Sequence, residues 1–134
     1  MSDRSESRLS AHWLGLAQAE FAGAMTLLSN EALEPRLGVA LATQAAEKAL
    51  KAALASIGVT PPRSHDLVDL ARRCRSVVRL TATELDLRRL ADAHAVARYP
   101  DAEETPYDID EATELVGVAR SVIADVAAAL DSTR

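Results

Sequence analysis

Aromatic residues and cysteine are scarce in this chain. Aromatics make up 3% of the 134 residues, and the single cysteine is Cys74. A lone cysteine cannot form an internal disulfide, and it fits a protein of the reducing cytoplasm. No group of cysteines and histidines has the spacing of a metal site, so we expect neither a metal nor another cofactor.

Long apolar runs are also missing. No segment approaches the roughly 20 apolar residues that a membrane-spanning helix needs. The N-terminal segment 1–8 consists mostly of charged and hydroxyl residues, where a secretory signal would have an apolar stretch. We therefore expect a cytoplasmic protein that makes no contact with a membrane.

Hydrophobic residues nevertheless account for 49% of the chain, which argues against disorder. They are mainly Ala, Leu and Val, which suits closely packed helices better than a β-sandwich rich in aromatic and β-branched residues. A chain of this length forms one domain with one core. The sequence predicts a single domain over 1–134, with its core at about 8–131.

Helix signals divide this domain into about five segments. Apolar residues recur at three- and four-residue steps, Pro35 suits the first turn of a helix, and Gly58 marks a helix end. Ser64 is expected to cap the third helix, the segment 81–84 has the form of a capping box, and Asp108 is expected to cap the last helix. The predicted helices are 8–29, 35–57, one starting at Ser64, 81–95 and one from Asp108 to about Leu130. The fold class is an all-α, up-and-down bundle in which the first, second and fifth helices form the core and two shorter helices lie across them.

Charge is unevenly distributed around a net value of −5, which argues against a general nucleic-acid-coating protein. The segment 63–89 contains seven arginines and four acidic residues, whereas 101–114 contains seven acidic residues and neither lysine nor arginine. The basic segment can pair with acidic residues between helices, or it can steer a polyanion to one face.

A polar stripe follows the predicted second helix. Gln44, Lys48 and Lys51 share one helix face, and Glu47 lies one turn before Lys51. The stripe is either a solvated face with a weak ion pair, or a polar contact buried against a neighbouring helix that the Ala-rich surface admits closely.

Two further motifs follow along the chain. His65 and Asp66 lie at the start of the third helix, where the histidine has either a structural hydrogen bond or a catalytic partner that the sequence does not reveal. Arg98-Tyr-Pro-Asp101 ends the fourth helix, because Pro100 disfavours helical conformation at Tyr99. Arg98 can bind a phosphate and Tyr99 can stack on a base, or Arg98 and Asp101 can simply pair with each other.

These motifs, in this order and at about this spacing, resemble the HEPN domain (higher eukaryotes and prokaryotes nucleotide-binding). The resemblance runs from about His12 to Leu130, and the branch it suggests is the small prokaryotic one often encoded beside a minimal nucleotidyltransferase. It implies an all-α bundle that forms a homodimer and is the toxin-like, nucleotide- or RNA-binding half of a toxin–antitoxin-type pair. The residues implied to bind nucleotide or RNA are Lys48, Arg98, Tyr99 and Asp101, and those of the structural signature are Gln44, Glu47, Lys51, His65 and Asp66.

The resemblance implies two further kinds of chemistry. Some nucleotidyltransferase partners adenylylate a tyrosine of the HEPN protein, which makes Tyr99 the first candidate acceptor and Tyr107 the second. Other HEPN families cleave RNA without a metal, using an arginine and a histidine that are separated by four to six residues. Here Arg89 and His94 have that spacing, although they precede the expected place of the motif. The alternatives to the binding role are therefore an active ribonuclease toxin and a purely structural dimeric scaffold.

Overall fold

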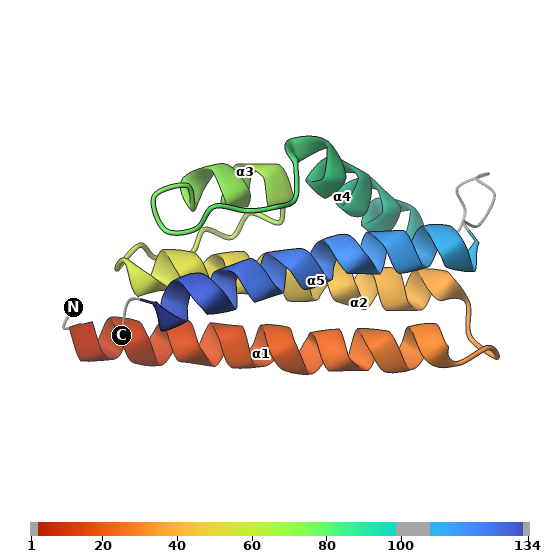
Figure 1. Cartoon of the computed structure of the whole chain (residues 1–134), viewed down its shortest axis with the longest axis horizontal. Coiled ribbons are helices and arrows are strands. Elements are labelled where there is room, and N and C mark those ends of the chain that lie inside the picture. The colour runs from red at the N-terminus through yellow and green to blue at the C-terminus, as the bar shows by residue number, and fades with distance from the viewer. Residues whose placement is uncertain (1–2, 99–107, 133–134) are drawn as a thin grey trace.

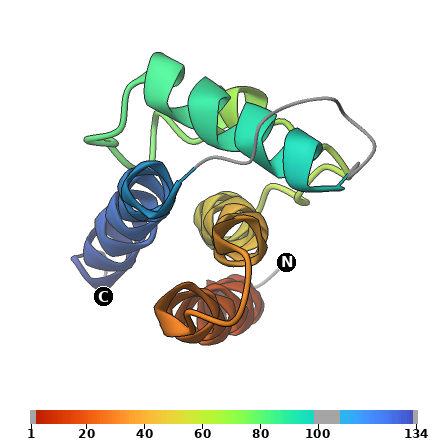
Figure 2. The same ribbon diagram turned by 90° about the vertical axis from the view of Figure 1, so that its right-hand side faces the viewer.

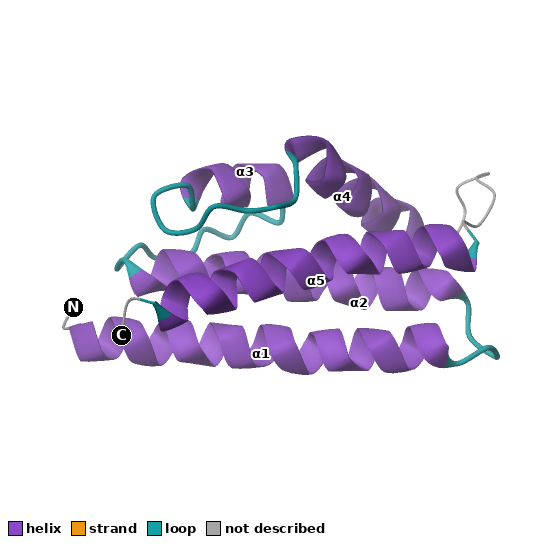
Figure 3. Cartoon of the chain, in the orientation of Figure 1, coloured by secondary structure: helices purple, strands orange, loops and turns teal. Residues whose placement is uncertain are grey.

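The chain folds into five α-helices, seen in a computed structural model that describes residues 3–98 and 108–132. Figure 3 shows that the regular elements within these described residues are all helices. They are α1 (Asp3–Ser29), α2 (Pro35–Ser56), α3 (Leu67–Arg73), α4 (Glu84–Arg98) and α5 (Ile109–Asp131). The side chains of Asp3 and of residues 94–98 lie outside the description, although their backbone belongs to α1 and α4.

The arrangement confirms the predicted all-α, up-and-down bundle. Helix α1 runs in one direction and α2 returns, α3 and α4 together lead the chain back, and α5 runs beside α2 (Figure 1). The end-on view in Figure 2 places α2 between α1, α5 and the layer of α3 and α4. Among the described residues, α2 contacts every other helix.

Small side chains explain why α2 can occupy this central position. Seven of its alanines are buried, so neighbouring backbones can approach closely on several sides. Gly38 marks the tightest approach to α1, because an added Cβ would lie 3.1 Å from the carbonyl oxygen of Ala24 and 3.2 Å from Cβ of Leu28. The buried alanines of α2 are Ala42, Ala45, Ala46, Ala49, Ala52, Ala53 and Ala55.

Several helix ends differ from the sequence-based expectation. Helix α1 begins five residues earlier than expected, and the buried hydroxyl of Ser10 donates to the carbonyl of Ala52, which fastens this end to α2 at 2.8 Å. Helix α4 continues to Arg98, three residues beyond the expected end, because the restriction imposed by Pro100 falls only on Tyr99. The end of α2 fits the prediction, since Gly58 has a positive φ of 74°.

Two predicted caps were assigned to the wrong residue. Asp66, not Ser64, caps α3, because its carboxylate accepts from the amides of Val68 and Asp69. The capping box of α4 pairs Thr83 with Asp86 and leaves Thr81 outside it. In both cases the cap is formed by a second suitable residue two positions later in the chain, whose side chain reaches the free amides of the first turn.

Candidate functional site

The polar stripe of α2 carries a hydrogen-bonded group made by Lys51, Glu47 and His65. Nζ of Lys51 donates to Oε2 of Glu47 at 3.0 Å, and Nδ1 of His65 lies 2.8 Å from Oε1 of the same carboxylate. An ionised carboxylate only accepts, so Nδ1 of His65 is the donor. Glu47 thus links α2 to the segment that leads into α3.

Burial distinguishes this hydrogen-bonded group from an ordinary solvated helix face. The Lys51 side chain is 9% exposed and that of Glu47 is 14% exposed. The Lys51 ammonium also lies 5.7 Å from the centroid of the Trp13 ring, within the range of a cation–π contact with α1. The structure therefore favours the buried-contact interpretation of Glu47 and Lys51 over the solvated face.

Lys48 belongs to a second contact between α1 and α2. Its ammonium forms an ion pair with Oε1 of Glu20, and both side chains are mostly buried. Oε2 of Glu20 is buried without a hydrogen-bond partner among the described residues. Gln44, by contrast, is exposed and contributes no contact to either group.

His65 and Asp66 have separate structural roles in the segment before α3. The His65 side chain is 76% exposed apart from its bond to Glu47. The amide of Asp66 donates to the hydroxyl of Ser64, while its carboxylate caps α3. Among the described residues, the hydrogen-bond partner of His65 is the Glu47 carboxylate and not a nucleophile. The geometry therefore fits a histidine that makes a structural hydrogen bond.

The arginine-rich segment is largely paired with acids, as the pairing hypothesis expected. Arg72 donates from Nε and Nη2 to the two oxygens of Glu84, at 2.7 and 3.0 Å, and Arg75 adds a contact at 3.3 Å. Arg73 pairs with Asp69 on α3 at 3.0 Å. The hydrogen bond from Arg72 holds the pKa of Glu84 below its usual value, and Glu84 in turn raises the pKa of Arg72.

Arg89, one of the two catalytic candidates, joins α4 to α5. Its Nη1 donates to Oε1 of Glu114 at 2.9 Å, and this bond is the main cause of the raised pKa of Arg89. His94 follows five residues later on the same helix. Positions five residues apart lie about 140° apart around an α-helix, so a straight α4 places the two candidates on different faces.

The remaining binding candidates lie at the edge of the described structure. Arg98 is the last residue of α4, and its side chain lies outside the description. Tyr99, Asp101 and Tyr107 fall outside the described residues altogether. The roles predicted for them from the sequence stay predictions.

Three partners of the predicted residues were missed in the sequence. Glu20 lies three residues after the buried Ala17 and four before the buried Ala24, so its position among core residues was a usable signal. Trp13 is an apolar residue of α1, and its sequence position gave no sign of a contact with a cation. Glu114 belongs to the acidic segment 101–114 and Arg89 to the basic segment, so pairing of this kind was a stated alternative, but the particular pair depends on how α4 crosses α5.

The described residues contain neither a membrane-spanning helix nor a cluster of metal ligands. No helix there is long and apolar enough to cross a membrane. Within the same residues, no group of three or more His, Cys, Asp and Glu side chains is placed to hold a metal ion.

The fold and the polar stripe define a small all-α protein whose central Ala-rich helix carries buried ion pairs to its neighbours. The family model of the HEPN domain matches residues 10–129. The chain therefore belongs to the HEPN domain family. Comparisons with curated proteins and with solved structures gave no match.

Proposed function

We propose that this HEPN protein is the toxin-like, nucleotide- or RNA-binding half of a cytoplasmic two-component system with a minimal nucleotidyltransferase. The observation that carries the proposal is the family match over residues 10–129, which spans all five helices. Binding is assigned to the end of α4 and the segment after it, where Arg98, Tyr99 and Asp101 follow one another. An arginine fork can hold a phosphate by two hydrogen bonds, and an aromatic ring can stack on a base.

Lys48 is a weaker candidate than Arg98 for binding nucleotide or RNA. Its ammonium is already paired with Glu20 in a mostly buried contact, so a phosphate would have to replace an existing partner. Its part in ligand binding stays a prediction, and its present contact supports a role in joining α1 to α2.

Homodimer formation is part of the same proposal. The face of α5 turned away from the core carries small residues at three- and four-residue steps, so the helix of a second copy could approach closely. These residues are Gly117, Ser121, Ala124 and Ala128. Sedimentation at micromolar concentration should give a dimer, and a monomer under those conditions would contradict this part of the proposal.

The proposed partner would modify a tyrosine, first Tyr99 and then Tyr107. In that reaction the phenolic oxygen attacks the α-phosphorus of a nucleoside triphosphate, and the bond from that phosphorus to the bridging oxygen breaks. Pyrophosphate leaves and the phenolic proton passes to a base of the partner. Coexpression with a minimal nucleotidyltransferase should raise the mass of the protein by one adenylyl group, and Tyr99→Phe should abolish most of the increase.

An active metal-independent ribonuclease toxin is the second candidate function. Its support is the spacing of Arg89 and His94 on one helix. The ion pair of Arg89 with Glu114 argues against it, because it occupies the guanidinium that would have to stabilise the phosphorane. A purely structural dimeric scaffold would give a dimer that binds neither nucleotide nor RNA.

Cleavage and binding of RNA by the purified protein distinguish these functions. The assay compares wild type, His94→Ala and Arg98→Ala in the presence of a chelator, at matched helix content by circular dichroism. The binding proposal expects RNA to be bound and left intact by wild type, and bound more weakly by Arg98→Ala. Cleavage that is lost in His94→Ala would instead establish the ribonuclease.

A further inference from the structure

One edge of α5 carries two opposite charges that have no ion pair among the described residues. They are Arg120, in the middle of the helix, and Asp131, its last residue, and both are exposed. Positions 120 and 131 are close to three full helical turns apart, so the two side chains lie on the same edge, about 16 Å from each other along the axis. At that separation they cannot pair with each other within one copy of the chain.

Arg120 is held in place by contacts that leave its charge unneutralised. Its guanidinium lies over the Phe21 ring of α1, 5.4 Å from the ring centroid, and Nη2 donates to Sδ of Met25 at 3.4 Å. A ring face and a thioether are weak partners for a cation. The other N–H groups of the guanidinium can therefore still donate to a carboxylate.

Asp131 lies in a hollow between α1 and the end of α5. The hollow has a volume of about 370 Å³ and is lined by Leu14, Ala127, Ala128, Leu130 and Asp131. Apart from the carboxylate this lining is apolar, so it suits a side chain with an apolar stem and a cationic head, as in arginine or lysine. The carboxylate also lies at the negative end of the α5 dipole, and the last turn of α5 contains no basic residue. A cation from outside the chain would stabilise both the carboxylate and the helix end.

We propose that this hollow receives Arg120 of a second copy of the chain, in a two-fold dimer with the two α5 helices packed antiparallel. In such a dimer every contact occurs twice, because residue i meets residue j and j meets i. An axis that crosses α5 midway between positions 120 and 131 places Arg120 of each copy opposite Asp131 of the other. The inference rests on the proposed function only for the existence of a dimer, and it defines which part of α5 forms the interface.

The surface at this crossing admits a second helix. Ala124 and Ala128 are exposed on either side of the axis, so the two helix axes can approach to about 8 Å. An axis along the helices would instead make them parallel and bring equal residue numbers side by side. Arg120 would then lie about 16 Å from Asp131 of the second copy, so the antiparallel arrangement is the one that pairs them.

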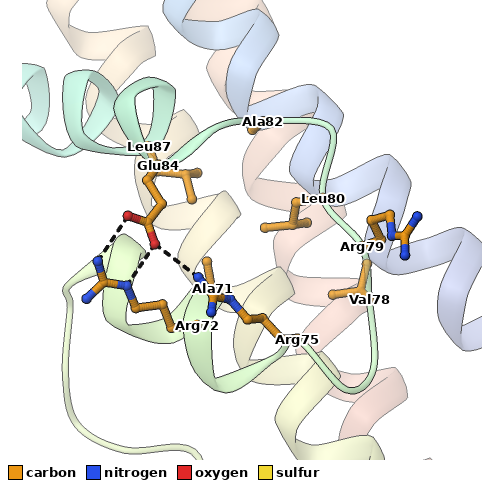
Figure 4. Close-up of a pocket in the computed structure, with 9 residues that line it drawn as sticks. All are labelled: Ala71, Arg72, Arg75, Val78, Arg79, Leu80, Ala82, Glu84 and Leu87. Carbon is orange, nitrogen blue, oxygen red and sulfur yellow. Dashed lines mark hydrogen bonds and ion pairs between the residues drawn. The ribbon is translucent and has the colours of Figure 1, made fainter.

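Arg79 also lies near α5 without an ion pair among the described residues, but on the other edge of the helix. It comes from the connection between α3 and α4, and its side chain points toward α5 from that side (Figure 4). Figure 2 shows α5 between this layer and α1. The antiparallel two-fold pairs the α1 edge of one copy with the α1 edge of the other, so Arg79 does not compete for the hollow.

Charge reversal tests the pairing in the full chain by sedimentation equilibrium. Arg120→Asp and Asp131→Arg should each weaken the dimer about tenfold, because both symmetry-related contacts become repulsive. The double variant exchanges the charges and should restore the dimer affinity to within about threefold of wild type. Arg88→Asp is the matched control, because it reverses one exposed arginine on α4, and it should leave the affinity unchanged. Circular dichroism should show the same helix content in all variants.

Cysteine cross-linking tests where the axis crosses α5. Ala124→Cys places the two new thiols about 4–5 Å apart along the helices, so a mild oxidant should link the two copies. Gly117→Cys lies on the same exposed face but about 25 Å from its counterpart along the helices, so it should not link. Wild type, whose Cys74 is buried, should stay unlinked. Cross-linking through position 117 and not through position 124 would overturn the proposed crossing.

Failure of the inference is distinguishable from failure of the proposed function. A wild-type dimer that both charge-reversed variants leave unchanged would overturn this interface and keep the dimer of the proposed function. A dimer weakened in both single variants and restored in the double variant, from a protein that binds neither RNA nor nucleotide, would keep the interface and overturn the proposed function. A wild type that is monomeric at micromolar concentration would overturn the interface, while the Arg98→Ala comparison would still decide RNA binding.

Discussion

Replacing Glu47 with Gln should destabilise the fold more than any ordinary change on a helix surface. The substitution keeps the size of the side chain and removes its negative charge. The Lys51 side chain, which is 9% exposed, would then have the Trp13 ring and a neutral amide as the neighbours of its ammonium. A buried cation without its counter-ion is strongly disfavoured, because the energy of its lost hydration is no longer offset.

The expected loss lies between two known limits. Breaking a fully buried ion pair costs about 3–5 kcal/mol, and an exposed pair contributes about 0.2–1 kcal/mol. Because Glu47 is 14% exposed and Gln can still accept one hydrogen bond, we expect a loss of about 2 kcal/mol. For 134 residues that corresponds to a fall in melting temperature of about 7 °C.

Urea unfolding at a fixed protein concentration measures this loss, since any dimer makes stability depend on concentration. Gln44→Ala is the control, because Gln44 is exposed on the same helix and should change stability by less than about 0.5 kcal/mol. Lys51→Met removes the buried cation, so Glu47→Gln should cost about 1 kcal/mol less in that background. A Glu47→Gln protein as stable as wild type, with no coupling to Lys51, would refute the reasoning.

Three further predictions follow from single contacts. Gly38→Ala should lower the free energy of unfolding by about 1–3 kcal/mol in urea, because the added Cβ meets α1. Gly15→Ala, whose added Cβ has nothing within 4 Å, should raise the free energy of unfolding by about 0.5–1 kcal/mol. Equal effects of the two substitutions would contradict the close approach of α1 and α2 at Gly38. Cys74 is buried, which raises its thiol pKa to about 11, so at pH 8 it should react with an alkylating reagent only after unfolding; rapid labelling of the native protein would show that the site opens. The pKa of Glu84 is lowered in the fold, so its stabilising effect is present above its unfolded pKa, near 4.5, and is lost as the pH falls further. In Glu84→Gln the midpoint of urea unfolding should therefore vary less between about pH 5 and 3 than in wild type. An unchanged pH dependence would contradict the contact.

The sequence predicted the helices well where a single local signal was present. Pro35 begins α2 and the carboxylate of Asp108 accepts from the amide of Glu111 in α5, as expected. The prediction was wrong where two capping residues stood two positions apart, as with Ser64 and Asp66. Propensity cannot decide between them, since both suit a cap and only the backbone conformation selects one.

Of the polar contacts of α2, the sequence could predict those within one helix but not those between helices. Glu47 and Lys51 are one helical turn apart, so their pairing follows from helix geometry alone. The partner of Lys48 is Glu20, 28 residues earlier, and their contact depends on how α1 packs on α2. Such a pairing is a product of tertiary structure, and the sequence could indicate only that Lys48 belonged to a polar stripe.

Charge pairing distinguishes the cations that join helices from those that have no ion pair among the described residues. The cations of α2 are paired within the fold, Lys48 with Glu20 and Lys51 with Glu47, so the polar stripe that resembles the family signature joins helices. On the layer of α3 and α4, Glu84 has two arginines, and Arg79 has no ion pair among the described residues. The two lysines of α2 thus already have carboxylate partners, whereas the Arg79 guanidinium has none among the described residues. The negative net charge of the whole chain does not cancel this local difference, because at physiological ionic strength exposed charges interact mainly within about 8 Å.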